Sequence, residues 1–175
     1  MAMDTVKKTV EYARSLEKEH DKVFRFTITT NGMLLSDENI DYINREMSNV
    51  VLSLDGRKDV NDHMRPTAGG KGSYDVIVPK FQKLVAGRGT KDYYARGTFT
   101  RENLDFAQDV MHLASLGFRH VSVEPASGPL DDPFAIKEED LDQVDAEYEK
   151  LARELVEQRK HEQKSALNNN VGKVT

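Results

Sequence analysis

The stretch Asn49–Gly56, with the sequence NVVLSLDG, decides the fold class of this chain. Its first six residues are mostly β-branched or aliphatic, which favours a buried strand, and Asp55-Gly56 is a typical turn that ends it. The segments Ser36–Met47 before it and Ser73–Val85 after it carry apolar residues at helical spacing. A buried strand between two amphipathic helices is typical of a parallel sheet with helical crossovers.

The same alternation extends in both directions along the chain. Aromatic and β-branched segments predict three more strands, at Val23–Thr29 (VFRFTIT), Asp92–Phe99 (DYYARGTF) and Phe118–Val123 (FRHVSV). Helical patterns separate and flank the strands, beginning with a helix capped by Asp4 and including Glu102–Leu116 and Glu138 to about His161. The order α-β-α-β-α-β-α-β-α therefore predicts an α/β fold of parallel βα repeats. Since four strands cannot close a barrel, we expect part of a larger βα barrel with strands missing at both ends.

Two segments depart from this regular pattern. Arg57–Gly72 is polar and long for a βα loop, and loops of that length are often functional. The last residues, 164–175 (KSALNNNVGKVT), have no periodicity, so we expect a barrel core over 1–163 and a disordered or foreign tail over 164–175.

The composition limits the chemistry that this chain can perform. It contains no cysteine, which excludes disulfides, thiolate nucleophiles, cysteine-ligated zinc and ordinary iron–sulfur ligation within the chain. Its net charge of −5 does not favour binding to nucleic acid. No segment approaches the about 20 apolar residues of a membrane span, and no apolar leader follows Met1. We therefore expect a cytoplasmic protein that binds neither nucleic acid nor membrane.

Functional residues of parallel α/β folds gather at the carboxyl ends of the strands. Here those ends are all polar, at Thr29–Gly32, Ser53–Gly56, Arg96–Thr100 and Glu124-Pro125. This pattern suits a ligand-binding rim, but it equally suits ordinary βα turns.

Two positions at these ends suggest particular contacts. Ser53 and Asp55 are two residues apart, so in a strand they face the same side and could hold a ribose diol; alternatively, Asp55 only makes the turn. Arg96 lies in an otherwise apolar and aromatic strand, where an unpaired charge is costly. Its partner is either a carboxylate of the fold or an anionic group of a ligand. His63 has Asp59 and Asp62 nearby but no second histidine, so we predict no metal site there.

A series of motifs in this order resembles the radical SAM superfamily. They are TTNG (Thr29–Gly32), SLDG (Ser53–Gly56), DVNDHMRP (Asp59–Pro66), GSYDVI (Gly72–Ile77), ARGTFTREN (Ala95–Asn103) and VSVEPA (Val121–Ala126). Within the superfamily, the chain is similar to the SPASM-type maturases that form thioether cross-links in SCIFF peptides, which carry six cysteines in forty-five residues. The resemblance covers roughly residues 3–160.

The resemblance implies a partial (β/α)6 TIM barrel, of which this chain would supply strands three to six. In the family, a three-cysteine loop holds a [4Fe-4S] cluster that binds S-adenosylmethionine, and its reductive cleavage gives a 5′-deoxyadenosyl radical that abstracts a hydrogen from the substrate peptide. This chain lacks the three-cysteine loop, the GGE-type motif and the cysteine-rich auxiliary domain. The resemblance therefore implies a central fragment that is inactive alone and binds S-adenosylmethionine weakly or not at all. The partner of the parent enzyme would be a cysteine-rich precursor peptide.

Residue by residue, the resemblance transfers a small set of candidates. Near S-adenosylmethionine it places Asn31, Ser53, Asp55, Arg96, Val123 and Glu124, with Arg96 toward the carboxylate and the backbone of Val123 and Glu124 toward the adenine. His63 and Arg65, in the loop, are candidates for contact with ligand or peptide. No catalytic residue and no metal ligand is assigned.

Two other hypotheses remain open. The chain could be a non-catalytic scaffold or interaction module that has kept the βα architecture without the cluster. It could also be an unrelated βα-barrel enzyme that uses Asp55 and Glu124 as acid–base groups. In each case an open barrel exposes two strand edges and apolar inner-facing side chains, which predicts self-association through the edges.

Overall fold

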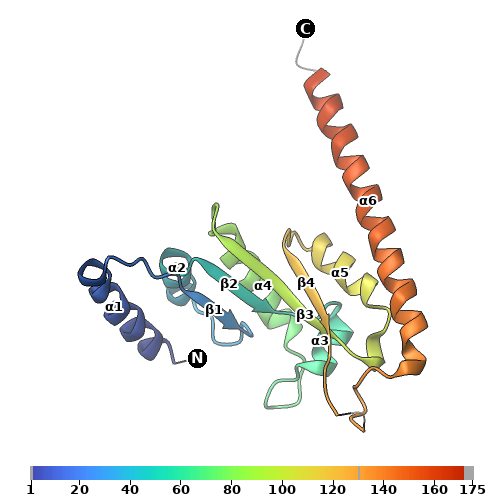
Figure 1. The fold of residues 1–175 in the computed structure, drawn as a ribbon, viewed down its shortest axis with the longest axis horizontal. Coiled ribbons are helices and arrows are strands. Elements are labelled where there is room, and N and C mark those ends of the chain that lie inside the picture. The colour runs from blue at the N-terminus through green and yellow to red at the C-terminus, as the bar shows by residue number, and fades with distance from the viewer. Residues whose placement is uncertain (1, 130, 172–175) are drawn as a thin grey trace.

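The structure, a computed structural model, describes residues 2–129 and 131–171 around one four-stranded sheet. All neighbouring strands are parallel and follow chain order: β1 (Thr27–Thr30), β2 (Asn49–Ser53), β3 (Asp92–Phe99) and β4 (Val121–Pro125). Because consecutive strands are neighbours, every connection is a simple crossover, as in a βα barrel. The predicted fold class is confirmed (Figure 1).

Helices occupy every connection. They are α1 (Met3–His20), α2 (Asp37–Glu46), α3 (Lys58–Met64), α4 (Tyr74–Ala86), α5 (Phe106–Ser115) and α6 (Leu141–Val171), with short 3-10 turns η1 (Arg101–Asn103) and η2 (Glu138–Asp140). Figure 1 shows α1 at the β1 end of the sheet and α6 at the β4 end. In the described part of the chain, no helix is both apolar enough and long enough to traverse a bilayer.

The hydrophobic core lies between one face of the sheet and the helices. Alternate residues of the central strands are buried against the helices, among them Val50 and Leu52 of β2 and Ala95 of β3. A second cluster joins the end of β3 to α5 and α6, where the rings of Phe99 and Phe106 stack with centroids 4.1 Å apart.

The other face of the sheet is polar. Strand alternation and register place on it Thr27, Thr29, Asn49, Val51, Ser53, Tyr94, Arg96, Thr98, Ser122 and Glu124. The expectation of apolar inner-facing side chains is therefore wrong for most positions. The apolar residues of each strand face the helices instead, so the open face keeps hydrogen-bonding groups.

A buried arginine donates hydrogen bonds to the carbonyl groups at the carboxyl end of α2. Arg88, 3% exposed, donates to the carbonyl oxygens of Met47, Ser48 and Asp92 at 3.1, 2.9 and 2.6 Å. Burial lowers the pKa of Arg88, while its carbonyl partners replace the water that the guanidinium loses. Lys91 donates to two further carbonyls of α2, at 2.7 Å each, so two cations cover the negative end of this helix.

Several predicted boundaries need correction. The first strand begins at Thr27 rather than Val23, which is 84% exposed and has no core to face. The fourth strand lies at Val121–Pro125 rather than at 118–123. The long loop contains α3, and Asp4 lies in the first turn of α1 without capping it.

At the carboxyl end of the chain, α6 continues past the expected end near His161 to Val171. Residues 172–175 of the expected tail lie outside the described residues. The division into a core over 1–163 and a tail over 164–175 stays a prediction.

Candidate functional site at the carboxyl ends of the strands

Polar side chains from three neighbouring strands meet on the open face near their carboxyl ends. The register aligns Ser53 of β2 with Arg96 of β3, and Arg96 with Ser122 of β4. One step further along, Thr98 of β3 lies opposite Glu124 of β4. The sheet thus brings together side chains that lie as much as 71 positions apart, between Ser53 and Glu124.

Arg96 and Glu124 form an ion pair across β3 and β4. Their side chains remain 51% and 50% exposed, and the Ser122 hydroxyl lies 3.4 Å from the Glu124 carboxylate. The sequence left two partners open for Arg96, and the structure gives it a carboxylate of the fold. Because half of each side chain stays accessible, the pair presents both charges to the open face. A zwitterionic ligand could exchange into such a pair without leaving either charge unpaired.

The Asp55 carboxylate is engaged in hydrogen bonds within the fold. Asp55 is 2% exposed, and the Arg65 guanidinium donates to both of its carboxylate oxygens, with Nε to Oδ2 at 2.6 Å and Nη2 to Oδ1 at 2.9 Å. The Thr98 N–H donates to the same carboxylate at 3.1 Å. Ser53 and Asp55 therefore do not form a free pair for a ribose diol. The same contacts occupy the carboxylate that an acid–base role for Asp55 would need.

A ring of hydrogen bonds holds the loop that contains α3 against the sheet. The Asn61 amide, fully buried, accepts from the Asp55 N–H at 3.4 Å and donates to the Ser73 hydroxyl at 3.1 Å. That hydroxyl donates in turn to the Arg65 carbonyl at 2.7 Å. The Ser73 hydroxyl therefore links Asn61 to the backbone of Arg65, and the side chain does not cap α4.

A second clamp fixes the turn after β2 to α5. Both the N–H and Nε of Arg57 donate to Asp109 Oδ1, at 2.9 and 2.8 Å, and Nη2 donates to Asp105 Oδ1 at 2.8 Å. The hydrogen bonds to Asp109 and then to Asp105 raise the pKa of Arg57 well above its usual range. Gly56 adopts φ of +146°, and a Cβ there would lie 2.3 Å from the Cβ of Asp109, so only glycine fits this approach.

The two loop residues proposed as substrate contacts point to different partners. Arg65 is engaged by Asp55, whereas the His63 Nε2 lies 2.7 Å from Glu102 Oε2 on the exposed side of η1. His63 and Glu102 border a small open pocket, together with Asp59, Val60, Met64, Thr100 and Asn103. Among the described residues no group of three potential metal ligands occurs, and no metal role is assigned to His63.

The remaining candidates lie at the margins of the site. Asn31 is exposed just after β1, where its side chain accepts from the Met33 N–H at 3.3 Å. The Val123 side chain packs against the cluster around Phe99, on the helix side of the sheet. The Val123 side chain therefore faces away from the open face, and a contact of its backbone with adenine stays a prediction.

Sequence reasoning missed the residues that hold the rim rigid. Arg57, Asn61 and Asp109 carry both hydrogen-bond networks, and Asp109 is fully buried within an amphipathic helix. An aspartate at that helical position has the pattern of a surface residue. Its role depends on a contact with Arg57, which lies 52 positions away.

Comparisons with known proteins agree with this architecture. No family model matches the sequence, and no curated protein matches it. Among solved structures, native anSMEcpe with bound AdoMet superposes with a TM-score of 0.68 at 14% identity, covering 82% of this chain and 40% of that one. Streptococcus suis SuiB gives 0.57 at 15% identity, covering 85% and 33%.

A domain of pyruvate-formate lyase-activating enzyme from Bacteroides vulgatus ATCC 8482 gives a TM-score of 0.52 at 14% identity, covering 83% of this chain and 86% of that one. The chain spans about two-fifths of the length of the anSMEcpe chain that it matches. Identities this low establish a shared fold and nothing finer. The chain therefore has the fold of part of a radical SAM βα barrel.

Proposed function

We propose that this chain is the central part of a radical SAM enzyme that modifies a ribosomally made peptide. The observation that carries the proposal is the open sheet face, in a fold shared with an AdoMet-bound structure. Its polar row Ser53–Arg96–Ser122 begins at the carboxyl end of β2, and Glu124 adds a carboxylate near the carboxyl end of β4. In parallel βα folds, ligands bind at the carboxyl ends of the strands. Strand position and side-chain chemistry thus support the same site.

The residues of the open face suit parts of S-adenosylmethionine. The Arg96 guanidinium is suited to bind the carboxylate of the methionine part, and the Glu124 carboxylate can accept from its ammonium group. Ser53 offers a hydroxyl to the ribose. Asp55 contributes indirectly, because its contacts with Arg65 and Thr98 hold the rim in shape.

The cluster of such an enzyme has no ligand within this chain. The chain contains no cysteine, so a [4Fe-4S] cluster would need thiolates from outside these 175 residues. In an enzyme of this class, S-adenosylmethionine supplies a 5′-deoxyadenosyl radical once the cluster has delivered an electron. The role of this chain is to bind and orient the molecule.

For the substrate, we propose a cysteine-rich precursor peptide and thioether cross-linking of the SCIFF type. Two solved structures of one protein that shares the fold support a peptide substrate: anSMEcpe has been solved with AdoMet and the peptides Cp18Cys and Kp18Cys, at TM-scores of 0.66 and 0.65. The thioether chemistry, and membership of the SPASM group, rest on the motif resemblance, including ARGTFTREN (Ala95–Asn103).

Calorimetric titration of the chain with S-adenosylmethionine tests the site. We expect weak binding to the wild-type chain and a loss of at least about tenfold in affinity for Arg96→Met, which keeps the aliphatic stem and removes the charge. Arg25→Met is the matched control, because Arg25 is 77% exposed and pairs only loosely with Asp92, at 3.9 Å, at the opposite end of the strands.

Equal affinity for Arg96→Met and the wild type would contradict the proposed site. Absence of any binding would instead favour the non-catalytic scaffold, for which the architecture alone is the function. The two hypotheses thus differ in one measurement.

A further inference from the structure

The ion pair between Arg96 and Glu124 occupies only part of the guanidinium. Nη2 of Arg96 donates to Glu124 Oε2, and among the described residues Nε and Nη1 have no acceptor. The two side chains remain 51% and 50% exposed, so ligands can reach both of them from the open face. A guanidinium has five N–H donors, and the free edge of Arg96 can therefore bind a carboxylate while Glu124 stays in place.

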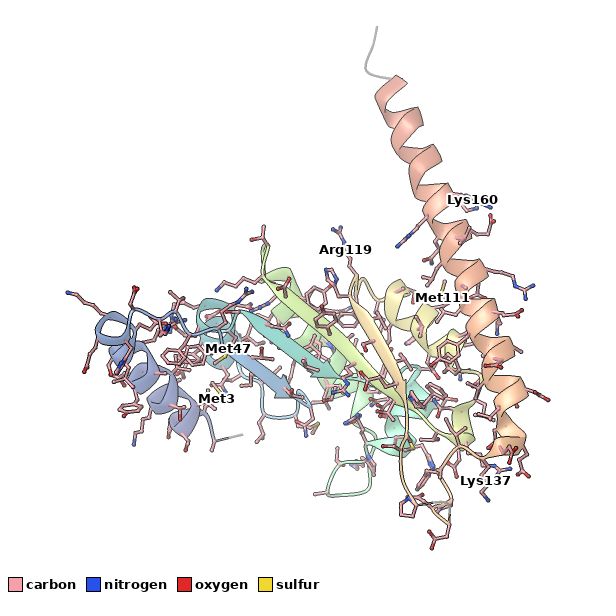
Figure 2. The ribbon with its side chains drawn as sticks, viewed as in Figure 1. Met3, Met47, Met111, Arg119, Lys137 and Lys160 are labelled. Atoms are coloured by element: carbon pink, nitrogen blue, oxygen red, sulfur yellow. The ribbon has the colours of Figure 1, made fainter. Side chains whose placement is uncertain are left out.

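The surroundings of the pair contribute hydroxyl groups but no further charge. The register places Ser53 and Ser122 on either side of Arg96. In the part of the chain that the structure describes, Glu124 is the one carboxylate that pairs with Arg96, and Arg96 is the one cation that pairs with Glu124. Figure 2 shows Arg119 at the amino end of β4, away from the carboxyl end where Glu124 lies. The site therefore carries one charge of each sign.

A balanced pair of this kind discriminates between ligands by their charges. A ligand that brings only a carboxylate places a second negative group beside Glu124, so that two carboxylates share one guanidinium. A ligand that brings only an ammonium group places a second cation beside Arg96. An α-amino acid group carries both charges on one carbon atom, so each charge of the protein meets an opposite charge of the ligand.

We propose that Glu124 is a specificity-determining residue that restricts this site to ligands with an α-amino acid group. The inference rests on the proposed function, because it concerns how the same site selects S-adenosylmethionine. The carboxylate of the ligand binds Nε and Nη1 of Arg96, and its ammonium group binds Glu124. A nucleoside without the amino acid group, such as methylthioadenosine, gains nothing from the pair.

A matched set of ligands tests this selection by calorimetric titration of the chain. S-adenosylhomocysteine carries both charges, its desamino analogue keeps only the carboxylate, and its decarboxylated analogue keeps only the ammonium group. With the wild-type chain, we expect the ligand with both charges to bind about fivefold more tightly than either analogue, as for pairs that are half exposed to solvent. Methylthioadenosine gives the affinity of a ligand with neither charge.

Glu124→Gln should change the order of the ligands, because it leaves the charge of Arg96 unbalanced. The variant should bind the desamino analogue about fivefold more tightly than the wild type does, and the decarboxylated analogue about fivefold more weakly. Arg96→Met should shift both affinities in the opposite direction. Glu139→Gln is the matched control, because Glu139 is 67% exposed and belongs to another Arg–Glu pair, with Arg101, that joins η1 to η2. It should leave every affinity unchanged.

The outcomes separate this inference from the proposed function. Equal binding of S-adenosylhomocysteine and its two analogues by the wild-type chain would overturn the selection and leave the proposed site intact. An unchanged order of affinities in Glu124→Gln would do the same. If that variant does not fold, as judged by circular dichroism, the wild-type series alone decides. Absence of binding by both S-adenosylmethionine and S-adenosylhomocysteine would overturn the proposed site together with the selection.

Discussion

Asp55 and Arg65 are joined by two parallel hydrogen bonds, of 2.6 and 2.9 Å, that fasten the 16-residue segment Arg57–Gly72 to the end of β2. The pair is largely shielded, with side-chain exposures of 3% and 34%. Its carboxylate also accepts from the backbone of β3 at Thr98. One side chain therefore ties together two strands and the loop that borders the open face.

Replacing Asp55 with alanine should destabilise the chain. The change leaves the Arg65 guanidinium and the Thr98 N–H without their acceptor, which costs about 2–4 kcal/mol in the free energy of unfolding for a largely buried pair. Urea unfolding monitored by circular dichroism measures the difference. Asp75→Ala is the control, because its pair with Lys58 is exposed to solvent and should contribute much less to stability. Similar losses for both variants would contradict the role given to Asp55.

Gly97 should tolerate no side chain. A Cβ there would lie 2.9 Å from the carbonyl oxygens of both Leu54 and Asp55, so Gly97→Ala forces β3 away from the turn after β2. We expect a loss of about 1–3 kcal/mol, as for other overpacked sites. Gly69→Ala, with open space around the new methyl group, should change stability by less than about 0.5 kcal/mol. Thermal unfolding of the two variants side by side decides between close packing and a dispensable glycine.

Loss of the Arg88 guanidinium should weaken the packing of α2 on the sheet. Arg88→Met fills much of the same volume but leaves the carbonyls of Met47, Ser48 and Asp92 without donors, and we expect a cost of about 2–4 kcal/mol. Arg88→Lys should rescue only part of this, since one ammonium group cannot reach all three carbonyls. Full rescue by lysine in a denaturant titration would show that charge alone matters.

The link between α1 and the strand entry should depend on pH. The Phe24 N–H donates to Glu17 Oε1 at 2.7 Å, and this bond, with Arg14 beside it, holds the pKa of Glu17 below its usual 4.5. Because the folded pKa is the lower one, the contact stabilises the fold above about pH 4.5 and is lost as pH falls through the folded pKa. The NMR shift of the Phe24 amide should titrate with a midpoint below 4.5 and should stop titrating in Glu17→Gln. A midpoint at or above 4.5 would refute the contact.

At high concentration the chain should self-associate through its sheet edges. Both β1 and β4 end the sheet with outward backbone groups, which pair readily with another chain. Light scattering should show a mass that rises with concentration, and Val123→Pro should reduce the part that depends on β4. A clean monomer at every concentration would show that the edges are protected.

The sequence predicted the fold because its signals are local. Strand and helix periodicities predicted the order of elements. Ser36, the first residue of a segment expected to be helical, caps α2 with its hydroxyl, which accepts from the Asn39 N–H at 3.3 Å. Helix α3 escaped prediction because seven residues hold too little periodicity, and Asn61 stabilises it through contacts outside the helix.

The candidate site was predictable only in position. The rule of strand ends located Arg96 and Glu124, but their pairing depends on the register of β3 and β4, which no local pattern contains. The bonds of Asp55 to Arg65 were not predictable, since Arg65 lies in a loop whose path the sequence does not fix. Arg88 had no signal at all, because its partners are backbone carbonyls rather than carboxylates.

The hydrophilic open face also dictates how binding there will register in a calorimeter. A small polar molecule that settles beside Arg96 and Ser53 displaces ordered water and covers little hydrocarbon, so its heat-capacity change should be close to zero. A ligand that instead covered apolar surface, such as the groove beside Val10 and Ile28, would give a clearly negative heat-capacity change. A titration repeated at several temperatures therefore tells which kind of surface a ligand has covered.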